Sequence, residues 1–418
     1  MIEKKEVILI ITHDLSINQT STFRYFSFIN ALKDKGHIVK GISFDFQFKP
    51  HPINSLEKLS GDFSTNSDIS IIKPIKNNII QKLLILSDKI KTPYFIKKFL
   101  LALHIIIYKS DQWLIDISNF DFCDSLKPTV IISGGAGGII KSSYLLAKKY
   151  NAKLIIDYRD PWNLGYQLLE TNSYIHFFKK KLTISSELKY LKYAEHITTV
   201  SDTLKSFFPS NFHHKITVIE NGSNFEISDT DYNFDFKSFN ITYTGTLYDD
   251  QLKDHSFFMA LSDFIKENFI SHDVLKLQFI GSKKNKSLIE IIKKYELESY
   301  TNITSRLNLM DLKKILQEAW LFLHLKYGDK RGIITSKNAD YILFNKPILL
   351  PNTDHGDIAE SILKNKAGYV CNGKIDDIKE VLKTEFQKFL NGVDSRLFNQ
   401  INSSMTRSEI AKKLHQII

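Results

Sequence analysis

Glycine turns follow two predicted strands in the second half of the chain. Gly245 and Thr246 come directly after one strand, and Gly281 and Ser282 come directly after the next, with Lys283 beside them. Because glycine has no side chain, the backbone N–H groups of such a turn can approach the oxygens of a diphosphate. Either glycine could instead serve a turn that binds nothing. Two such turns with an adjacent cation favour an anionic ligand.

A further candidate lies where a strand gives way to a helix. We expect this helix to begin near Thr335 or Ser336, which places Lys337 in its first turn and Asp340 one turn further on. A helix N-terminus offers free N–H donors and a positive dipole, and Lys337 adds a cation where a phosphate would lie. Asp340 could hold the hydroxyl pair of a ribose. The alternative is a Ser or Thr cap followed by a solvated, exposed lysine.

The first half of the chain carries a smaller set of candidates. Arg159 and Asp160 follow the predicted strand 153–157, and ligands of open α/β sheets bind beyond the carboxyl ends of strands. His13 and Arg24 occupy the loop and the helix start after the first strand. The alternatives are an Asp-Pro turn for the first pair and ordinary surface residues for the second.

We expect neither a metal nor a bound cofactor. An Asp-x-Asp pattern at 229–231 lies in a linker and not at a strand end. The two cysteines, Cys123 and Cys371, are far apart and belong to no Cys/His cluster, so they indicate neither zinc nor a disulfide framework.

The elements that must position these residues alternate between strands and helices. Continuous β-branched runs predict strands, and apolar residues at helical spacing predict the helices between them, which is typical of parallel sheets covered by helices. The predicted strands are 7–12, 38–44, 129–133, 153–157, 196–200, 215–219, 240–243, 276–280, 320–325 and 347–350. The predicted helices are 22–35, 139–150, 202–208, 256–267, 287–295, 310–319 and 336–344.

This order predicts an α/β chain of two Rossmann-like parallel-sheet domains that face each other across an interdomain cleft. We expect an N-terminal domain over 1–220, a linker over 221–238 and a C-terminal domain over 239–395. The remaining helical segment, 396–418, is expected to pack back on the N-terminal domain. A chain of 418 residues exceeds what one core usually serves.

The composition fits a soluble protein, with 43% hydrophobic and 24% charged residues. The apolar run 7–11 is too short for a signal core, and 99–108 is about half a membrane span, so we expect a cytoplasmic protein. The net charge of +10 is concentrated in the lysine-rich stretch 70–109. Peripheral contact with an anionic membrane at its inner face is therefore expected. No nucleic-acid recognition motif is present, so nucleic acid is not an expected partner.

Six motifs together resemble family 4 of the retaining glycosyltransferases, in the bacterial branch that builds surface polysaccharides. They are IIDYRDPW, AEHITTVSDTLKSFF, KITVIENGSN, ITYTGTLY, LKLQFIGS and GIITSKNADYILFNKPILLP, in that order. The resemblance covers nearly the whole chain and implies a GT-B fold. It implies metal-free transfer, with retention of configuration, from a nucleotide-diphosphate sugar to a glycan or polyprenyl-linked acceptor. The departing diphosphate would be stabilised by backbone amides and basic side chains.

The resemblance assigns the nucleotide sugar to the second half of the chain. Gly245 and Thr246 match the family's phosphate turn, Gly281 matches a nucleotide-side turn, and Lys337 and Asp340 match the helix start beside the donor.

The acceptor would be bound by the first half of the chain, where His13 and Arg24 are the candidates. Asn221 and Gly222 match the start of the interdomain hinge.

Three departures from the family pattern accompany these matches. The loop 13–20 has no glycine, although the family often has a Gly-Gly loop there. Gly332 and Asp340 stand where a pair of glutamates is common, and Thr246 stands where an arginine is usual. Lys253 is the candidate for the family's second cation, at a shifted spacing.

Two other functions stay open. A nucleotide-sugar 2-epimerase would share the fold and the diphosphate site, but it needs acid and base carboxylates at the sugar, and the second half shows no clear pair. A catalytically weak or inactive subunit that binds sugar nucleotides gains support from the departures at Gly332 and Thr246.

Overall fold

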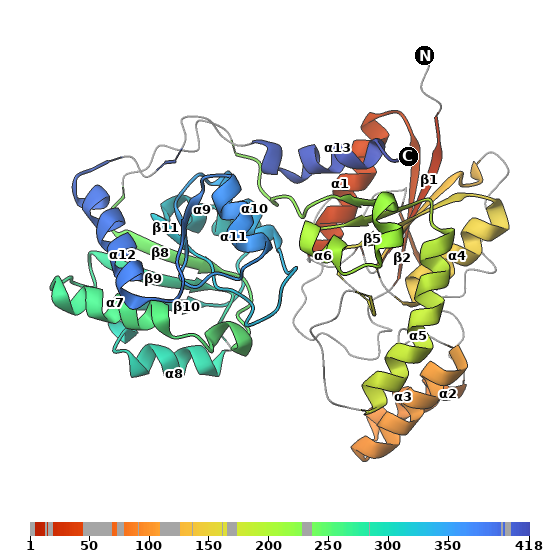
Figure 1. Cartoon of the computed structure of the whole chain (residues 1–418), viewed down its shortest axis with the longest axis horizontal. Coiled ribbons are helices and arrows are strands. Elements are labelled where there is room, and N and C mark those ends of the chain that lie inside the picture. Colours follow the sequence, from red (N-terminus) through yellow and green to blue (C-terminus); the bar gives the residue numbers. More distant parts are fainter. Residues whose placement is uncertain are drawn as a thin grey trace. The chain divides into compact units, whose positions relative to one another are not determined.

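The computed structural model describes residues 5–12, 15, 20–44, 69–72, 79–90, 92–108, 126–135, 137–160, 162–164, 174–227, 236–283, 285–393, 396–397 and 403–418. The chain divides into two compact units (Figure 1). The first unit comprises 1–220 and 410–418, and the second comprises 221–409.

The first unit contains a parallel sheet of seven strands, in the order β3-β2-β1-β4-β5-β6-β7. The strands are β1 (Val7–Thr12), β2 (Ile38–Phe44), β3 (Ile69–Ile72), β4 (Val130–Gly134), β5 (Lys153–Tyr158), β6 (His196–Thr199) and β7 (Ile216–Val218). All their pairings are parallel, so every carboxyl end lies at the same edge of the sheet.

The helices of this unit are α1 (Thr20–Asp34), α2 (Ile79–Lys89), α3 (Tyr94–Tyr108), α4 (Gly138–Tyr150), α5 (Tyr174–Tyr193) and α6 (Asp202–Ser206). Successive strand residues pack into different cores: Leu9 packs with residues of α4 and α5, whereas Ile8 and Ile10 pack with α1. Residues 410–415 of α13 (Arg407–His415) join the core that contains α1. Both faces of the strands are thus buried, which explains their unbroken apolar runs.

The second unit contains a parallel sheet of six strands, in the order β10-β9-β8-β11-β12-β13. The strands are β8 (Phe239–Thr244), β9 (Leu275–Ile280), β10 (Thr301–Thr304), β11 (Leu321–Leu323), β12 (Ile348–Leu350) and β13 (Gly368–Val370). The helices are α7 (Ser256–Glu267), α8 (Lys286–Lys294), α9 (Leu309–Glu318), α10 (Ser336–Leu343), α11 (Asp357–Lys364) and α12 (Ile375–Leu390).

The helices of the second unit cover opposite faces of its sheet. Leu321 and Leu323 of β11 pack with α7, α8 and α12, whereas Phe322 between them packs with α9, α10 and α11. The prediction of an α/β chain with parallel sheets is confirmed. Every predicted strand and helix is present to within a few residues. The sequence analysis missed β3, β10 and β13 and the helices α2, α3, α5, α11 and α12.

None of the helices within the described ranges combines the length and the apolar character needed to cross a membrane.

Gly368 gives a direct test of the second sheet. It has φ +148°, and a Cβ added there would overlap the backbone of Ile348, its partner in the register of β12 and β13. We expect Gly368→Ala to cost about 2 kcal/mol or more, and so to lower Tm by about 4 °C or more. Gly392→Ala is the matched control, because Gly392 also has positive φ (+63°) but open space around it. Calorimetric melts in which the two variants lose equal stability would contradict this packing.

Candidate functional site

The two glycine turns of the second unit lie against each other. Gly245 follows β8 with φ +98°, and Gly281 follows β9 with φ +92°, a region that favours glycine. The hydroxyl of Ser282 donates to the carbonyl oxygen of Gly245 (3.0 Å). A Cβ on Gly281 would lie 3.3 Å from that same oxygen. The turns therefore form one joined loop pair at the carboxyl edge of the sheet.

Most backbone amides of these turns are already engaged. The N–H of Gly245 donates to Ile280, and the N–H groups of Gly281, Ser282 and Lys283 all donate to the carbonyl of Thr304. These four amides are not free donors for a diphosphate, which corrects the expectation for them. The N–H of Thr246, an exposed residue, has no partner within the described part of the chain.

Lys337 lies in the first turn of α10, and the predicted helix start is confirmed, with Thr335 as N-cap and Ser336 as the first helical residue. The alternative of an exposed, solvated lysine is wrong, because Lys337 is only 7% exposed. Its Nζ atom lies 3.7 Å from the centre of the Tyr243 ring and forms no hydrogen bond among the described residues. A Cβ on Gly245 would lie 3.5 Å from Lys337 Cε. The ammonium thus stands directly beside the first glycine turn.

Burial dominates the electrostatics of this ammonium. It lowers the pKa of Lys337 from 10.5 to about 7, and the charge of Asp340 offsets only part of that effect. The pKa of His324, which is completely buried, falls to about 3 because of burial and, second, because of the nearby Lys337 charge. The site therefore contains a neutral imidazole and an amine that loses its proton close to neutral pH.

Helix α10 is held on the sheet by Tyr341. The N–H of Thr244, the last residue of β8, donates to the Tyr341 hydroxyl (2.8 Å). The Tyr341 ring stacks on Phe322 of β11, with the ring centres 4.2 Å apart. Since Lys337 lies one turn earlier on the same helix, these contacts fix it beside Gly245.

Asp340 connects α10 to the beginning of the second unit. Its Oδ1 atom accepts hydrogen bonds from the Ser223 hydroxyl (2.7 Å) and from the N–H of Asn224 (3.1 Å). Burial raises the pKa of Asp340 to about 6, although these hydrogen bonds and the charge of Arg407 act in the opposite direction. The structure thus gives Asp340 protein partners that the sequence analysis did not predict.

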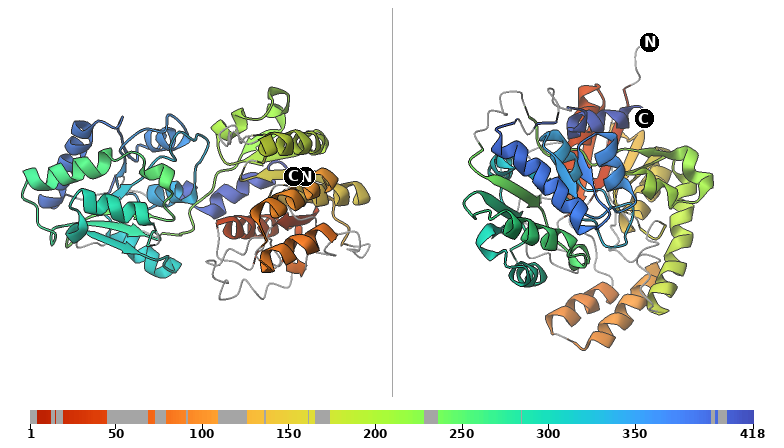
Figure 2. Two further views of the ribbon diagram at one scale, coloured as in Figure 1. Left: turned by 90° about the horizontal axis from the view of Figure 1, so that it is seen from below. Right: turned by 60° about the vertical axis from the view of Figure 1, so that its left-hand side comes forward.

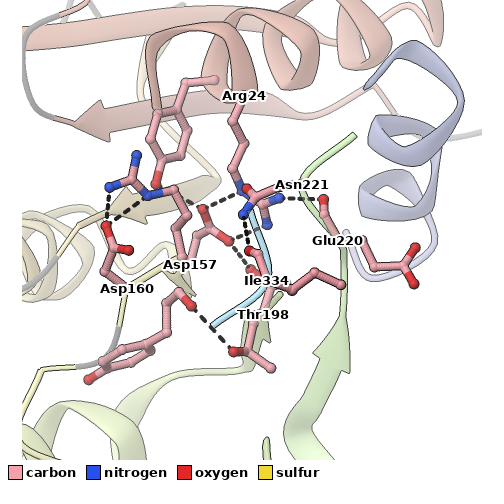
Figure 3. A network of polar contacts seen from close by, with 11 residues as sticks. Arg24, Asp157, Asp160, Thr198, Glu220, Asn221 and Ile334 are labelled. Atoms are coloured by element: carbon pink, nitrogen blue, oxygen red, sulfur yellow. Dashed lines mark hydrogen bonds and ion pairs between the residues drawn. The ribbon is translucent and has the colours of Figure 1, made fainter. Parts of the chain in front are cut away.

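The predicted hinge residues contact the same region of the second unit. The side-chain amide of Asn221 donates to the carbonyl of Ile334 (3.3 Å; Figure 3). A Cβ on Gly222 would lie 2.6 Å from the Cα of Arg407. Only glycine therefore fits at position 222 without moving the backbone.

A pocket of about 440 Å³ adjoins the glycine turns. It is lined by residues 246–249, 281, 282 and 285–287, so Thr246, Gly281 and Ser282 face a common space. Lys253 is not among them: it is exposed and pairs with Asp250 (2.6 Å), which also pairs with Lys330.

In the first unit, Arg24 forms a buried ion pair with Asp157 at the end of β5 (Figure 3). Its Nε and Nη2 atoms donate to the two carboxylate oxygens (3.0 and 2.8 Å), and Nη1 donates to the carbonyl of Glu220 (2.7 Å). Arg24 is 2% exposed, so the surface alternative is wrong. Its guanidinium holds α1 to the carboxyl end of β5, a structural contact that the sequence analysis missed.

Asp157 also accepts hydrogen bonds from the hydroxyls of Tyr25 (2.8 Å) and Thr198 (2.6 Å). Burial alone would raise its pKa, but the Arg24 charge and these hydrogen bonds together hold the pKa below its usual value. The sequence could have indicated that Asp157 is buried and paired, because it is the only acid in the apolar strand β5.

The other candidates of the first unit are less enclosed. Arg159 and Asp160 bond to each other at the carboxyl edge, and Asp160 is 63% exposed (Figure 3). His13 lies outside the described residues, as do Cys123 and the Asp-x-Asp at 229–231. A second carboxylate that the sequence analysis missed is Glu187 of α5. Burial raises its pKa to about 7, and Tyr158 donates to it.

Within the ranges that the structure describes, no three His, Cys, Asp or Glu side chains gather closely enough to hold a metal ion.

Comparison with known proteins identifies the fold. No family model and no curated protein sequence matches the chain. Among solved structures, it is similar to a glycosyltransferase from Rickettsia africae, with 15% identity, 99% of this chain and 93% of that chain covered, and a TM-score of 0.54. It is also similar to UDP-GlcNAc 2-epimerases from Methanocaldococcus jannaschii (10% identity, 98% of each chain, TM-score 0.51) and Neisseria meningitidis (10%, 98% of each chain, 0.52). The latter structure is bound to UDP-GlcNAc.

These similarities show a two-domain GT-B-like α/β fold, as predicted. At such low identity they do not extend to family 4 or to its surface-polysaccharide branch, which stay predictions.

The burial of Lys337 predicts an unusual effect on stability. Its pKa is about 7 in the folded chain and 10.5 in the unfolded one, so the unfolded state binds the extra proton between these values. Stability therefore rises with pH across that window, and the cost of burying the amine is greatest below about pH 7. We expect Lys337→Met to raise Tm at pH 6.5 by about 2 °C or more, and the gain to shrink by pH 10.

Lys276→Met, which removes an exposed lysine of β9, is the control and should leave Tm unchanged. Equal melting curves for Lys337→Met and the parent protein at pH 6.5 would rule out a buried charged amine.

Proposed function

We propose that this protein is a metal-independent retaining glycosyltransferase that takes a sugar from a nucleotide-diphosphate donor. The observation that carries the proposal is the buried amine of Lys337, which lies beside the Gly245 turn and has no hydrogen-bond partner among the described residues. The fold is similar to that of a solved glycosyltransferase and of solved epimerases, which supports an enzyme that acts on nucleotide sugars.

The Lys337 site suits a multiply charged anion. An amine that is buried without a hydrogen-bond partner is costly, and a phosphate oxygen would supply the missing acceptor. The N-terminus of α10 contributes its positive dipole end, and the free N–H of Thr246 adds a donor at the neighbouring turn. These groups belong to α10 and to the turn after β8, and the hydrogen bond between Tyr341 and Thr244 fixes the two elements relative to each other.

In the proposed reaction, the bond between the anomeric carbon and the diphosphate oxygen breaks, and the acceptor oxygen bonds to that carbon on the same face. The acceptor's hydroxyl proton leaves with the diphosphate. Negative charge grows on the departing phosphate, so an ammonium at Lys337 stabilises the transition state more than the bound donor. Asp160 and Arg159 are the proposed groups on the acceptor side, together with His13, whereas Arg24 would act there only indirectly, through its ion pair with Asp157.

The proposed acceptor is a glycan or polyprenyl-linked molecule, in the cytoplasm or at the inner face of the cell membrane. Gly281, Ser282, Thr335 and Ser336 are proposed donor contacts, and Lys253 would join them only by leaving Asp250. No cofactor is required.

The second candidate is a nucleotide-sugar 2-epimerase, which the likeness to solved epimerases favours equally at the level of fold. Epimerisation at C2 needs a base for the C2 proton. Four buried carboxylates are hydrogen-bonded within the protein: Asp157 to Arg24, Glu187 to Tyr158, Asp340 to Ser223 and Glu385 to Trp320. This engagement supports transfer over proton abstraction. A subunit that binds the nucleotide sugar without turnover is the remaining alternative.

A screen of nucleotide sugars should distinguish the three candidates. We expect release of the nucleoside diphosphate that depends on acceptor and persists in excess chelator. An epimerase would instead convert the donor without acceptor and exchange the C2 proton with solvent deuterium. Binding with neither reaction would identify a non-catalytic subunit. Abolition of transfer by chelator and its rescue by manganese would contradict the metal-free mechanism.

Lys337→Ala should lower the turnover rate at saturating donor by roughly two orders of magnitude, the scale lost with one preorganised stabilising group. Lys337→Arg should restore only part of the rate, because a planar guanidinium does not reproduce a compact ammonium. Lys276→Ala, at an exposed site, is the control. Unchanged steady-state turnover in a folded Lys337→Ala protein would remove Lys337 from the mechanism.

A further inference from the structure

Helices α2 and α3 carry apolar residues on their exposed sides. In α2 and the turn after it, Ile79, Leu83, Leu86 and Ile90 recur at helical spacing and are between 43% and 76% exposed. The adjoining side of α2 is the buried one, with Ile80, Leu84 and Ser87. Helix α2 therefore uses one apolar side for packing and leaves a second apolar side uncovered.

Helix α3 repeats this arrangement. Phe95, Phe99 and Ile106 share one side of the helix and are between 57% and 71% exposed, whereas His104 is buried. Helix α3 packs against both α2 and α5. The pair α2 and α3 lies beside the end of α5 that is farther from the sheet of the first unit (Figures 1 and 2). The turn between α2 and α3 is fixed by the N–H and the hydroxyl of Thr92, which both donate to the carbonyl of Ser87. The exposed residues thus belong to an ordered helical pair.

Cations flank these residues. The stretch 69–109 contains eight lysines and one acid, Asp88. Lys82 precedes Leu83 and Lys98 precedes Phe99, and both lysines are exposed. The Nζ atom of Lys98 lies 4.5 Å from the centre of the Tyr94 ring.

We propose that the exposed apolar side of α2 and α3 inserts into the surface of an anionic lipid bilayer. Protein interfaces are depleted in lysine, whereas helices that lie in a membrane interface combine Phe and Leu with lysines. Helix α3 has 15 residues, or roughly 22 Å, which is shorter than a bilayer core of about 30 Å. It lies in the interface and does not cross it. This contact is independent of the proposed sugar transfer.

Vesicle sedimentation of the full chain tests the proposal. The protein should sediment with vesicles of phosphatidylcholine and phosphatidylglycerol in equal amounts, far less with pure phosphatidylcholine, and less at high salt because exposed charges are screened. Phe95→Ser with Phe99→Ser should lower the partition coefficient at least about tenfold, since two large apolar side chains no longer leave water. Both residues are exposed, so the melting temperature should not change.

The matched control is Phe269→Ser with Met310→Ser, two residues 95% and 74% exposed in the second unit, and it should bind like the parent protein. Equal binding to neutral and anionic vesicles, binding to neither, or undiminished binding of the Phe95 and Phe99 variant would each overturn the proposal. A dimer in light scattering that this variant abolishes, without vesicle binding, would assign the surface to a second copy of the chain.

Lys82→Gln with Lys98→Gln should weaken binding to anionic vesicles and reduce its salt dependence, and Lys276→Gln with Lys293→Gln should not.

Discussion

Parallel pairing of every described strand is the constraint on which the candidate site depends. It brings all carboxyl ends of a sheet to one edge, so residues far apart in sequence meet there. In the second unit, this brings the turn after β8 next to the turn after β9, and α10 then begins beside the first of these turns. Gly245 and Lys337 are 92 positions apart, yet a Cβ added at Gly245 would lie 3.5 Å from Lys337 Cε. The chemistry proposed for the chain is a consequence of that shared edge.

The two units use this edge differently. In the first, the buried cation Arg24 meets the buried carboxylate Asp157 with two direct hydrogen bonds, so the charges compensate each other. In the second, the buried cation Lys337 faces an aromatic ring, and Asp340, whose charge acts on it, accepts hydrogen bonds from Ser223 and Asn224. Breaking the first pair would leave an uncompensated charge, whereas burial lowers the pKa of Lys337 to about 7, so this amine carries its charge only up to about neutral pH. An arrangement that lacks its counter-charge is what a site for an anionic ligand requires.

The sequence predicted most strands and the start of α10, because apolar periodicity and N-capping residues act locally. It could not predict that Arg24 is buried, since that depends on Asp157, which is 133 positions away. It also missed that Gly281, Ser282 and Lys283 turn their amides towards Thr304, because β10 was not recognised as a strand. Helices α2 and α3 were missed for a different reason: their apolar residues lie on two sides, so no single amphipathic stripe indicated a helix. Long-range partners decided the first two of these cases, and an ambiguous local pattern decided the third.

The position of the cation also bears on the choice between transfer and epimerisation. A phosphate that leaves during the reaction gains charge at the bridging oxygen, and a fixed ammonium there lowers the barrier. Epimerisation additionally needs a carboxylate or another base that can take a proton from carbon. Tyr341 and Phe322 hold the helix that carries Lys337 beside Gly245, whereas Asp340, whose charge acts on Lys337, is oriented by Ser223 and Asn224. Releasing Asp340 for proton transfer would break the contacts that join α10 to the beginning of the second unit. The geometry is therefore better suited to stabilising a departing anion than to abstracting a proton.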